Sequence, residues 1–249
     1  MATPQNSRII ARPGMSRAVS RASQAARDIK QYVDAEEWNY YDSQLFAAAA
    51  SAVGNILTLA TFPANGQLAF FNARTISNAG EALTSMSDVN KFENDFRCYC
   101  ISIDAWMDTD AASAAGIANA SAFVEAVVNY SALKLSFGTD VKFLEPVVKM
   151  PSGGGIVQNV KIRTQAAAAN SDSASASNGL QTAQAKRYFK APIFFKNGQQ
   201  FSLALFFQAQ AITRIQGLQA LVAPFQAGIR VNLEGVRGKP LLRGVAVNR

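Results

Sequence analysis

The residue types that most often carry out chemistry in proteins are scarce in this chain. Its 249 residues include no histidine, which removes the Ser-His-Asp and Cys-His arrangements and the common zinc sites. Its two cysteines, Cys98 and Cys100, stand two apart in a strand-like apolar run and so point to one face. A disulfide between positions i and i+2 of a strand would be strained. We therefore expect both to be small buried hydrophobic side chains.

Acidic residues provide the next candidates for a site. Asp104, Asp108 and Asp110 could supply oxygen ligands to calcium, but the segment lacks the glycine and the terminal glutamate of an EF-hand loop. We expect them to cap the Ala-rich segment that follows. The glycine run at 153–155 lacks the Gly-Lys-Ser/Thr of a phosphate loop. Three further glutamates lie in separate segments: Glu125, Glu145 and Glu234. Nothing in the sequence pairs them as a glycosidase requires, so we expect no enzyme, no cofactor and no metal site.

Positive charge is concentrated at the N-terminus. The whole chain has a net charge of +7, and most of it comes from the first thirty residues, which contain one acid, Asp28. The cations there are Arg8, Arg12, Arg17, Arg21, Arg27 and Lys30. A localised basic arm is typical of proteins that bind the phosphates of nucleic acid or lipid head groups. A disordered, solubilising tail explains the same charge pattern equally well.

The arm is predicted to span residues 1–55 and to contain an amphipathic helix. The apolar stripe of that helix is Met15, Val19, Ala22, Ala26, Ile29 and Val33. Its alanines favour packing on protein over lying on a membrane. The uncharged stretch 43–73 is long enough to cross a membrane, but its alanines, Asn55 and Pro63 oppose that reading. A short helix over 43–54 that leads into a strand over 56–62 fits better.

The remainder, residues 56–249, is predicted to form a β-sandwich domain. Short apolar or alternating runs separated by turn residues indicate strands at 56–62, 68–76, 96–103, 132–137, 141–143, 156–164, 193–195, 201–207 and 229–236. The class is all-β, with roughly eight strands, and eight strands in two sheets make a jelly roll. A helical insertion is expected at 105–126. The Ser/Ala-rich segment 165–185 has too little apolar bulk for a strand and is expected to be a flexible loop.

The strongest local pattern lies near the C-terminus. The apolar runs 193–195 and 201–207 flank Asn197-Gly198, the preferred dipeptide of a two-residue hairpin turn. Phe201, Leu203 and Leu205 are expected on the core face of the second strand. The last strand should bury Ile229, Val231 and Leu233 and expose the residues between them.

These features together resemble the jelly-roll capsid proteins of tailless icosahedral bacteriophages, including the membrane-containing kinds. The resemblance rests on the basic N-terminal helix, the Phe-rich segment 193–207 and the closing run Ile229-Arg-Val-Asn-Leu-Glu-Gly-Val. It implies β-sandwich subunits that form a homo-oligomeric building block, often a trimer. It also implies an arm that reaches neighbouring subunits, other virion proteins, the genome or an internal membrane.

We accordingly expect a structural virion protein, in particular the major capsid protein, which self-assembles into an icosahedral shell in the host cytoplasm. Charged residues make up only 16% of the chain against a usual value of about 25%, which favours extensive subunit contacts.

Two alternatives remain open. A receptor- or carbohydrate-binding β-sandwich, such as a spike or attachment protein, would place tryptophan near acids, as Trp106 lies near Asp104 and Asp108. A nonspecific nucleic-acid-binding protein would mix aromatic and basic residues, as Tyr188 and its neighbours do.

Overall fold

The computed structural model describes eleven strands and two α-helices. The described residues are 32–47, 56–62, 66–72, 84–85, 90–109, 114–150, 153–161, 173–179, 182, 185–218 and 225–240. The six basic residues predicted to contact nucleic acid or lipid, from Arg8 to Lys30, lie outside them, as does nearly all of the helix predicted over 15–33.

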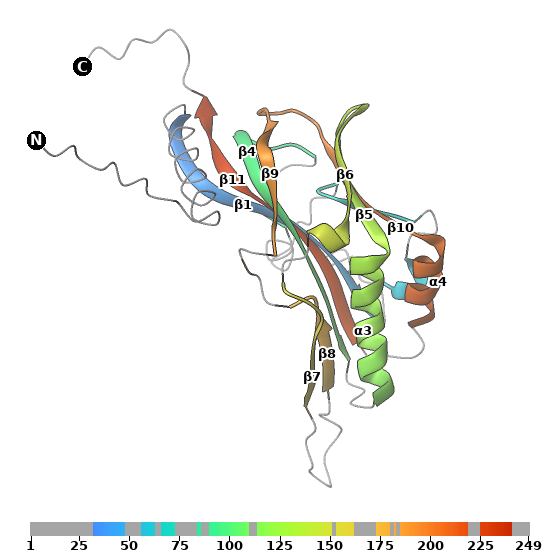
Figure 1. Cartoon of the computed structure of the whole chain (residues 1–249). Coiled ribbons are helices and arrows are strands. Elements are labelled where there is room, and N and C mark those ends of the chain that lie inside the picture. The colour runs from blue at the N-terminus through green and yellow to red at the C-terminus, as the bar shows by residue number, and fades with distance from the viewer. Residues whose placement is uncertain are drawn as a thin grey trace, which may run out of the picture.

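One sheet has seven strands and is built around three long neighbours, β1, β11 and β4, which lie side by side (Figure 1). Its members are β1 (Tyr32–Ala47), β2 (Ile56–Leu57), β4 (Asp95–Thr109), β7 (Val157–Lys161), β8 (Ser173–Ser177), β9 (Arg187–Phe195) and β11 (Phe225–Pro240). The order is β2-β1-β11-β4-β8-β7, and β9 pairs with another part of β4. All pairs are antiparallel except β1 with β2.

The second sheet has four antiparallel strands in the order β3-β10-β5-β6. They are β3 (Gln67–Phe70), β5 (Ser131–Phe137), β6 (Asp140–Pro146) and β10 (Ser202–Phe207). The remaining elements are α3 (Ala114–Asn129), α4 (Ala209–Leu218) and the short helices η1 (Leu59–Thr61) and η2 (Val147–Lys149). Helix α3 packs against β4, β8 and α4, and the β7–β8 ribbon extends beyond the sandwich (Figure 1). Among the described residues, no helix combines the length and apolar character needed to cross a membrane.

The core lies between the two sheets and follows the period-two alternation of their strands. Fully or nearly fully buried residues include Ile101 and Ile103 of β4, Ile229, Val231 and Leu233 of β11, Leu133 and Leu135 of β5, and Leu203 and Leu205 of β10. Each such side chain contributes roughly 1.5–3 kcal/mol when it leaves water. The predictions that 229, 231 and 233 face inward, and that 201, 203 and 205 are buried, are confirmed. The all-β class, with two sheets of mainly antiparallel strands, is also confirmed.

The helix predicted over 43–54 is wrong for residues 43–47, which belong to β1. Strand β1 pairs with β11 along almost its whole length, from Tyr32 opposite Pro240 to Ala47 opposite Gln226. Helix propensity is a weak local preference, and a long ladder to a neighbouring strand overrides it. The sheet therefore begins at Tyr32, well before the predicted boundary at residue 56.

The hairpin predicted at Asn197-Gly198 is also wrong. The dipeptide does turn the chain, with a positive φ of 69° at Gly198. However, β9 before it pairs with β4 in the large sheet, and β10 after it pairs with β3 and β5 in the small one. The turn thus carries the chain from one sheet to the other. The backbone N–H of Asn197 is held by the Asp95 side chain at 2.8 Å, a contact that local sequence does not reveal.

The flexible loop predicted over 165–185 is wrong for residues 173–177, which form β8. This strand lies between β4 and β7, and Ala174 and Ala176 are buried where α3 packs against it. Small side chains allow a helix to approach a strand closely. The small residues of β8 therefore allow α3 to pack against it. The predicted insertion at 105–126 does contain a helix, but β4 continues to Thr109 and α3 runs from Ala114 to Asn129.

Candidate interaction surface

The outer face of the seven-stranded sheet, turned away from the small sheet, carries polar side chains along its three long strands. We define the outer face as Asn39, Tyr41 and Ser43 of β1, Arg230, Asn232 and Glu234 of β11, and Cys100, Ser102, Asp104 and Trp106 of β4. Strand register places these residues in rows, such as Ser43, Arg230 and Asp104. Their neighbours in sequence point inward to the core, as alternation requires. Such a concentration of polar groups over central strands is a candidate binding surface.

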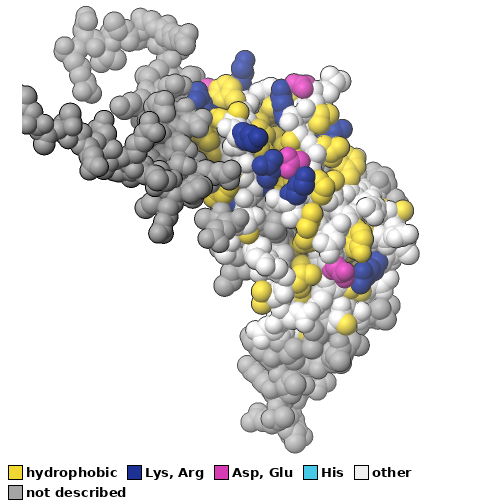
Figure 2. All heavy atoms as spheres, viewed as in Figure 1, with side chains coloured by type: hydrophobic (Ala, Val, Ile, Leu, Met, Phe, Trp, Pro, Cys, Tyr) yellow, Lys and Arg dark blue, Asp and Glu magenta, His cyan; other side chains and the backbone are white. Residues whose placement is uncertain are grey.

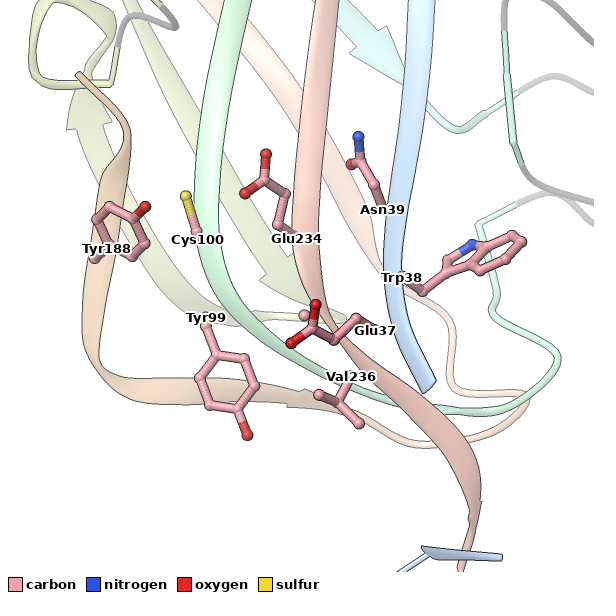
Figure 3. Close-up of a pocket in the computed structure, with 9 residues that line it drawn as sticks. Glu37, Trp38, Asn39, Tyr99, Cys100, Tyr188, Glu234 and Val236 are labelled. Carbon is pink, nitrogen blue, oxygen red and sulfur yellow. The ribbon is translucent and has the colours of Figure 1, made fainter. Parts of the chain in front are cut away.

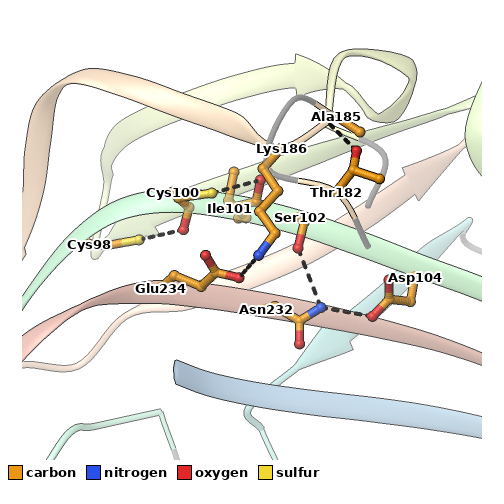
Figure 4. Close-up of polar contacts among 10 residues, drawn as sticks. All are labelled: Cys98, Cys100, Ile101, Ser102, Asp104, Thr182, Ala185, Lys186, Asn232 and Glu234. Atoms are coloured by element: carbon orange, nitrogen blue, oxygen red, sulfur yellow. Dashed lines mark hydrogen bonds and ion pairs between the residues drawn. The ribbon is translucent and has the colours of Figure 1, made fainter. Parts of the chain in front are cut away.

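A hydrogen-bond network fixes the middle of the outer face (Figure 4). The amide of Asn232 donates to Asp104 Oδ2 at 2.9 Å and to Ser102 Oγ at 3.5 Å. Lys186, just before β9, forms an ion pair with Glu234. Ser102 and Asn232 are buried, so these bonds replace the water that the groups lose. The face is therefore ordered, and part of its charge is neutralised.

A cavity of about 410 Å³ opens at one end of the outer face (Figure 3). Its lining includes Glu37, Trp38, Asn39, Tyr99, Cys100, Tyr188, Glu234, Gly235 and Val236. Strand β4 departs from regular pairing with both β9 and β11 here, between Cys98 and Cys100. Figure 3 shows Glu37 and Glu234 on the cavity side of their strands and the Trp38 indole turned away from them.

Cys98 and Cys100 are confirmed as buried and free. The prediction that they point to one face is wrong, because the irregularity between them leaves Cys98 in the core and Cys100 in the lining of the cavity. Burial is the main cause that raises the pKa of the Cys98 thiol well above its usual range, with a smaller contribution from Cys100. The Cys98 thiol donates a hydrogen bond to the Cys100 carbonyl oxygen at 3.2 Å. A thiol must ionise to act as a nucleophile, so Cys98 is a packing residue.

The described carboxylates form no cluster that suits a metal ion. No group of three His, Cys, Asp or Glu residues suited to a metal ion occurs among the described residues. The three glutamates considered from sequence form ion pairs in different places: Glu125 with Arg214, Glu145 with Arg187, and Glu234 with Lys186. Asp104 and Asp108 lie in β4 rather than capping a helix, and Asp110 is outside the described residues.

The pair of Glu145 and Arg187 links the two sheets, because Glu145 is in β6 and Arg187 begins β9. Arg187 Nε and Nη2 each donate to one carboxylate oxygen at 2.8 Å, a bidentate geometry. The hydrogen bond from Arg187 is the main cause that lowers the pKa of Glu145. Sequence reasoning missed this link because the two residues are 42 positions apart and belong to different sheets.

We expect Arg187→Lys to lower the free energy of unfolding by less than about 1 kcal/mol, because lysine cannot form the two-pronged contact and the pair is partly solvated. Because Glu145 has a lowered pKa in the folded protein, its contribution is present above the usual carboxyl pKa of about 4.3 and is lost as pH falls through the lowered value. Urea unfolding at pH 7 and at pH 3 should show a smaller difference between variant and wild type at the lower pH. An equal difference at both values would contradict the role of the charged pair.

A second cavity, of about 320 Å³, lies farther along the outer face, where β8 ends beside β4. Its lining includes Asp104, Ala105, Trp106, Ser177, Asn178, Gly179 and Arg230. The Asn178 side chain takes the place of a strand partner for β4: it donates to the Ile103 carbonyl and accepts from the Ala105 N–H at 3.1 Å. Trp106 and Asp104, which are two residues apart in the sequence, both line this cavity.

Comparison with known proteins adds no family to these observations. No family model matches the chain, and no curated protein matches it either.

Proposed function

We propose that this chain is a jelly-roll subunit of an icosahedral virus shell, and in particular the major capsid protein. The observation that supports this proposal is the order in which its strands pair. Eight strands, β1, β3, β4, β5, β6, β9, β10 and β11, pair first with last, second with seventh, third with sixth and fourth with fifth. A long doubled ribbon that rolls into two sheets gives this order, which is the jelly-roll plan. On this proposal, β2, β7 and β8 are strands added to the eight-stranded jelly roll.

The surface of the sandwich supports an assembly role. On the face seen in Figure 2, charged side chains gather mainly in the upper part, and uncharged and hydrophobic side chains cover most of the rest of the described surface. The exposed large hydrophobic residues lie mostly on or beside the edge strands β6 and β7: Val141, Leu144, Val148, Ile156 and Val157. Apolar groups on an unpaired strand edge favour contact with another chain. We propose that neighbouring subunits, for example those of a trimer, cover these edges in the assembled virion.

The basic arm completes the proposal. Arg8, Arg12, Arg17 and Arg21 attract phosphate without reading sequence, and such attraction suits an arm that faces a genome or an internal membrane. No cofactor or catalytic activity is part of the proposed function.

The proposal is tested by purifying the expressed chain on a density gradient and imaging it by electron microscopy. Closed particles of uniform size are the expected result. A monodisperse monomer that fails to assemble under all salt conditions tried would overturn the shell proposal.

The arm has its own test. Changing Arg8, Arg12, Arg17 and Arg21 to glutamine should leave subunits folded and able to form particles. It should lower the nucleic acid or lipid carried by each particle, measured at equal protein, because four phosphate-binding charges are lost. A matched control changes Lys134, Lys142, Lys149 and Lys196, all in the sandwich, to glutamine. Unchanged content in the arm variant would leave the arm without an electrostatic role.

A further inference from the structure

The guanidinium group of Arg230 lies between two aromatic rings on the outer face. Its Cζ is 5.2 Å from the centre of the Tyr41 ring and 5.7 Å from that of Trp106. Its Nε donates to Ser43 Oγ at 2.8 Å. Its terminal nitrogens make no ion pair or hydrogen bond with the described residues. Arg230 is thus held in place while most of its donors are left available.

The Trp106 ring is held flat against the sheet. A Cβ added at Gly228 would lie only 2.2 Å from Trp106 Cζ2, so the indole occupies the space that a side chain at position 228 would fill. The ring is half-buried and forms part of the wall of the 320 Å³ cavity. Asp104 lines the same cavity, and Asn232 holds its carboxylate. A carboxylate has about four acceptor positions, so it can accept several hydrogen bonds at once.

We propose that this cavity binds a neutral sugar ring, as one residue of a glycan. A pyranose presents an apolar C–H face, which fits an aromatic surface such as Trp106, and a rim of hydroxyl groups. The terminal N–H groups of Arg230 donate to hydroxyl oxygens, and Asp104 accepts from a hydroxyl. The cavity volume falls at the lower end of the range of about 300–1,000 Å³ that is usual for small ligands.

Charge favours a neutral sugar over nucleic acid. Arg230 and Asp104 are direct partners in the register of β11 and β4, so the charges of the described lining residues cancel. The other described charges on this side of the long strands include Glu37, Arg97, Glu234 with its partner Lys186, and Asp108. Binding of a nucleic acid backbone requires an excess of cations over anions. The described residues of this surface do not provide such an excess.

The test uses the full chain and a panel of methyl glycosides of glucose, galactose, mannose and N-acetylglucosamine. The chain has two tryptophans, so Trp38→Phe makes the fluorescence report on Trp106 alone. We expect at least one glycoside to change this fluorescence saturably in the millimolar range. Arg230→Lys and Asp104→Asn should each weaken binding by about tenfold or more, because each changes a directional hydrogen-bonding group. Saturation-transfer NMR of the glycoside extends the test to Trp106→Phe and Trp106→Ala, which lack the tryptophan fluorescence. If the alanine variant does not fold, the phenylalanine variant alone is used for this test.

Arg97→Lys is the matched control, because Arg97 also lies over an aromatic ring, that of Phe194, but outside the cavity. It should bind the glycoside as wild type does. Absence of saturable binding to the whole panel, or equal binding by the Arg230 and Asp104 variants, would overturn the inference. Binding of a ten-residue oligothymidine that is lost in Arg230→Lys, without glycoside binding, would assign the cavity to nucleic acid instead. Electron microscopy of the same preparation reports on shell assembly separately, so the two proposals can fail independently.

Discussion

Replacing Phe92 by alanine is expected to lower the free energy of unfolding by about 3–5 kcal/mol, the usual range for a buried phenylalanine. Phe92 is buried and stacks on Tyr40 at 4.1 Å and on Phe201 at 4.9 Å between ring centroids. It also makes edge contacts with Phe96 and Phe195. These rings come from three strands of the large sheet, β1, β4 and β9, and from the segment just before β10, so the cavity left by alanine cannot close by moving one element.

The measurement is urea unfolding at pH 7, followed by circular dichroism. Phe194→Ala is the matched control, since its ring is 38% exposed, and it should cost less than about 1 kcal/mol. A loss below about 1 kcal/mol in Phe92→Ala would show that the aromatic cluster does not hold the segment before β10 against the large sheet.

The second large effect concerns Asp42, an inward-facing acid in the middle of β1. Its Oδ2 accepts a hydrogen bond from the Phe71 backbone N–H at 2.6 Å, just beyond the end of β3 in the other sheet. Phe71 has a positive φ of 60°, an uncommon conformation for a bulky residue. Burial is the main cause that raises the pKa of Asp42 from 3.8 to about 6, and the hydrogen bonds to Phe71, Thr84 and Ser43 oppose it.

This raised pKa predicts that stability falls as pH increases. Below about pH 4 the carboxyl is protonated in both folded and unfolded chains. Between about pH 4 and pH 6 only the folded chain keeps the proton, so each step upward in pH favours unfolding, and the effect levels off above pH 6. The difference between a pKa of 3.8 and one of about 6 corresponds to a loss of about 3 kcal/mol in the free energy of unfolding as the pH rises from about 4 to above 6.

Asp42→Asn cannot ionise and should lose this component of the pH dependence. Urea unfolding of both proteins should therefore show wild type gaining about 1 kcal/mol relative to the variant between pH 7 and pH 5. Asp95→Asn is the control, because Asp95 is also a buried acid of the same sheet that accepts a backbone N–H. Parallel pH profiles for wild type and Asp42→Asn would rule out a raised pKa at this site.

The alternating runs of the sequence determined the β class and most of the strands that carry apolar side chains. Ile229, Val231 and Leu233 face the core because side chains alternate along any strand, whatever its partners are. The burial of Cys98 and Cys100 followed from their apolar neighbours in the same way. These are local properties, and a single chain shows them directly.

Strand pairing was decided only by tertiary structure. The prediction of a turn at Asn197-Gly198 is correct. The strands on either side of it pair with β3, β4 and β5, which lie far away in the chain, and not with each other. The Ser-Ala strand β8 exists because β4, β7 and α3 surround it, and β1 extends to Ala47 because β11 matches it residue for residue. Weak local preferences yield to such ladders.

The candidate sugar site could be predicted only in part. The sequence placed Trp106 near Asp104, because residues two apart share a face of a strand. It gave no indication of Arg230, which lies more than a hundred residues later and reaches the same cavity only through the pairing of β11 with β4. A sequence lists the groups that can bind a ligand, but long-range packing sets the distances between these groups. Strand pairing joins residues that have no fixed spacing in the chain.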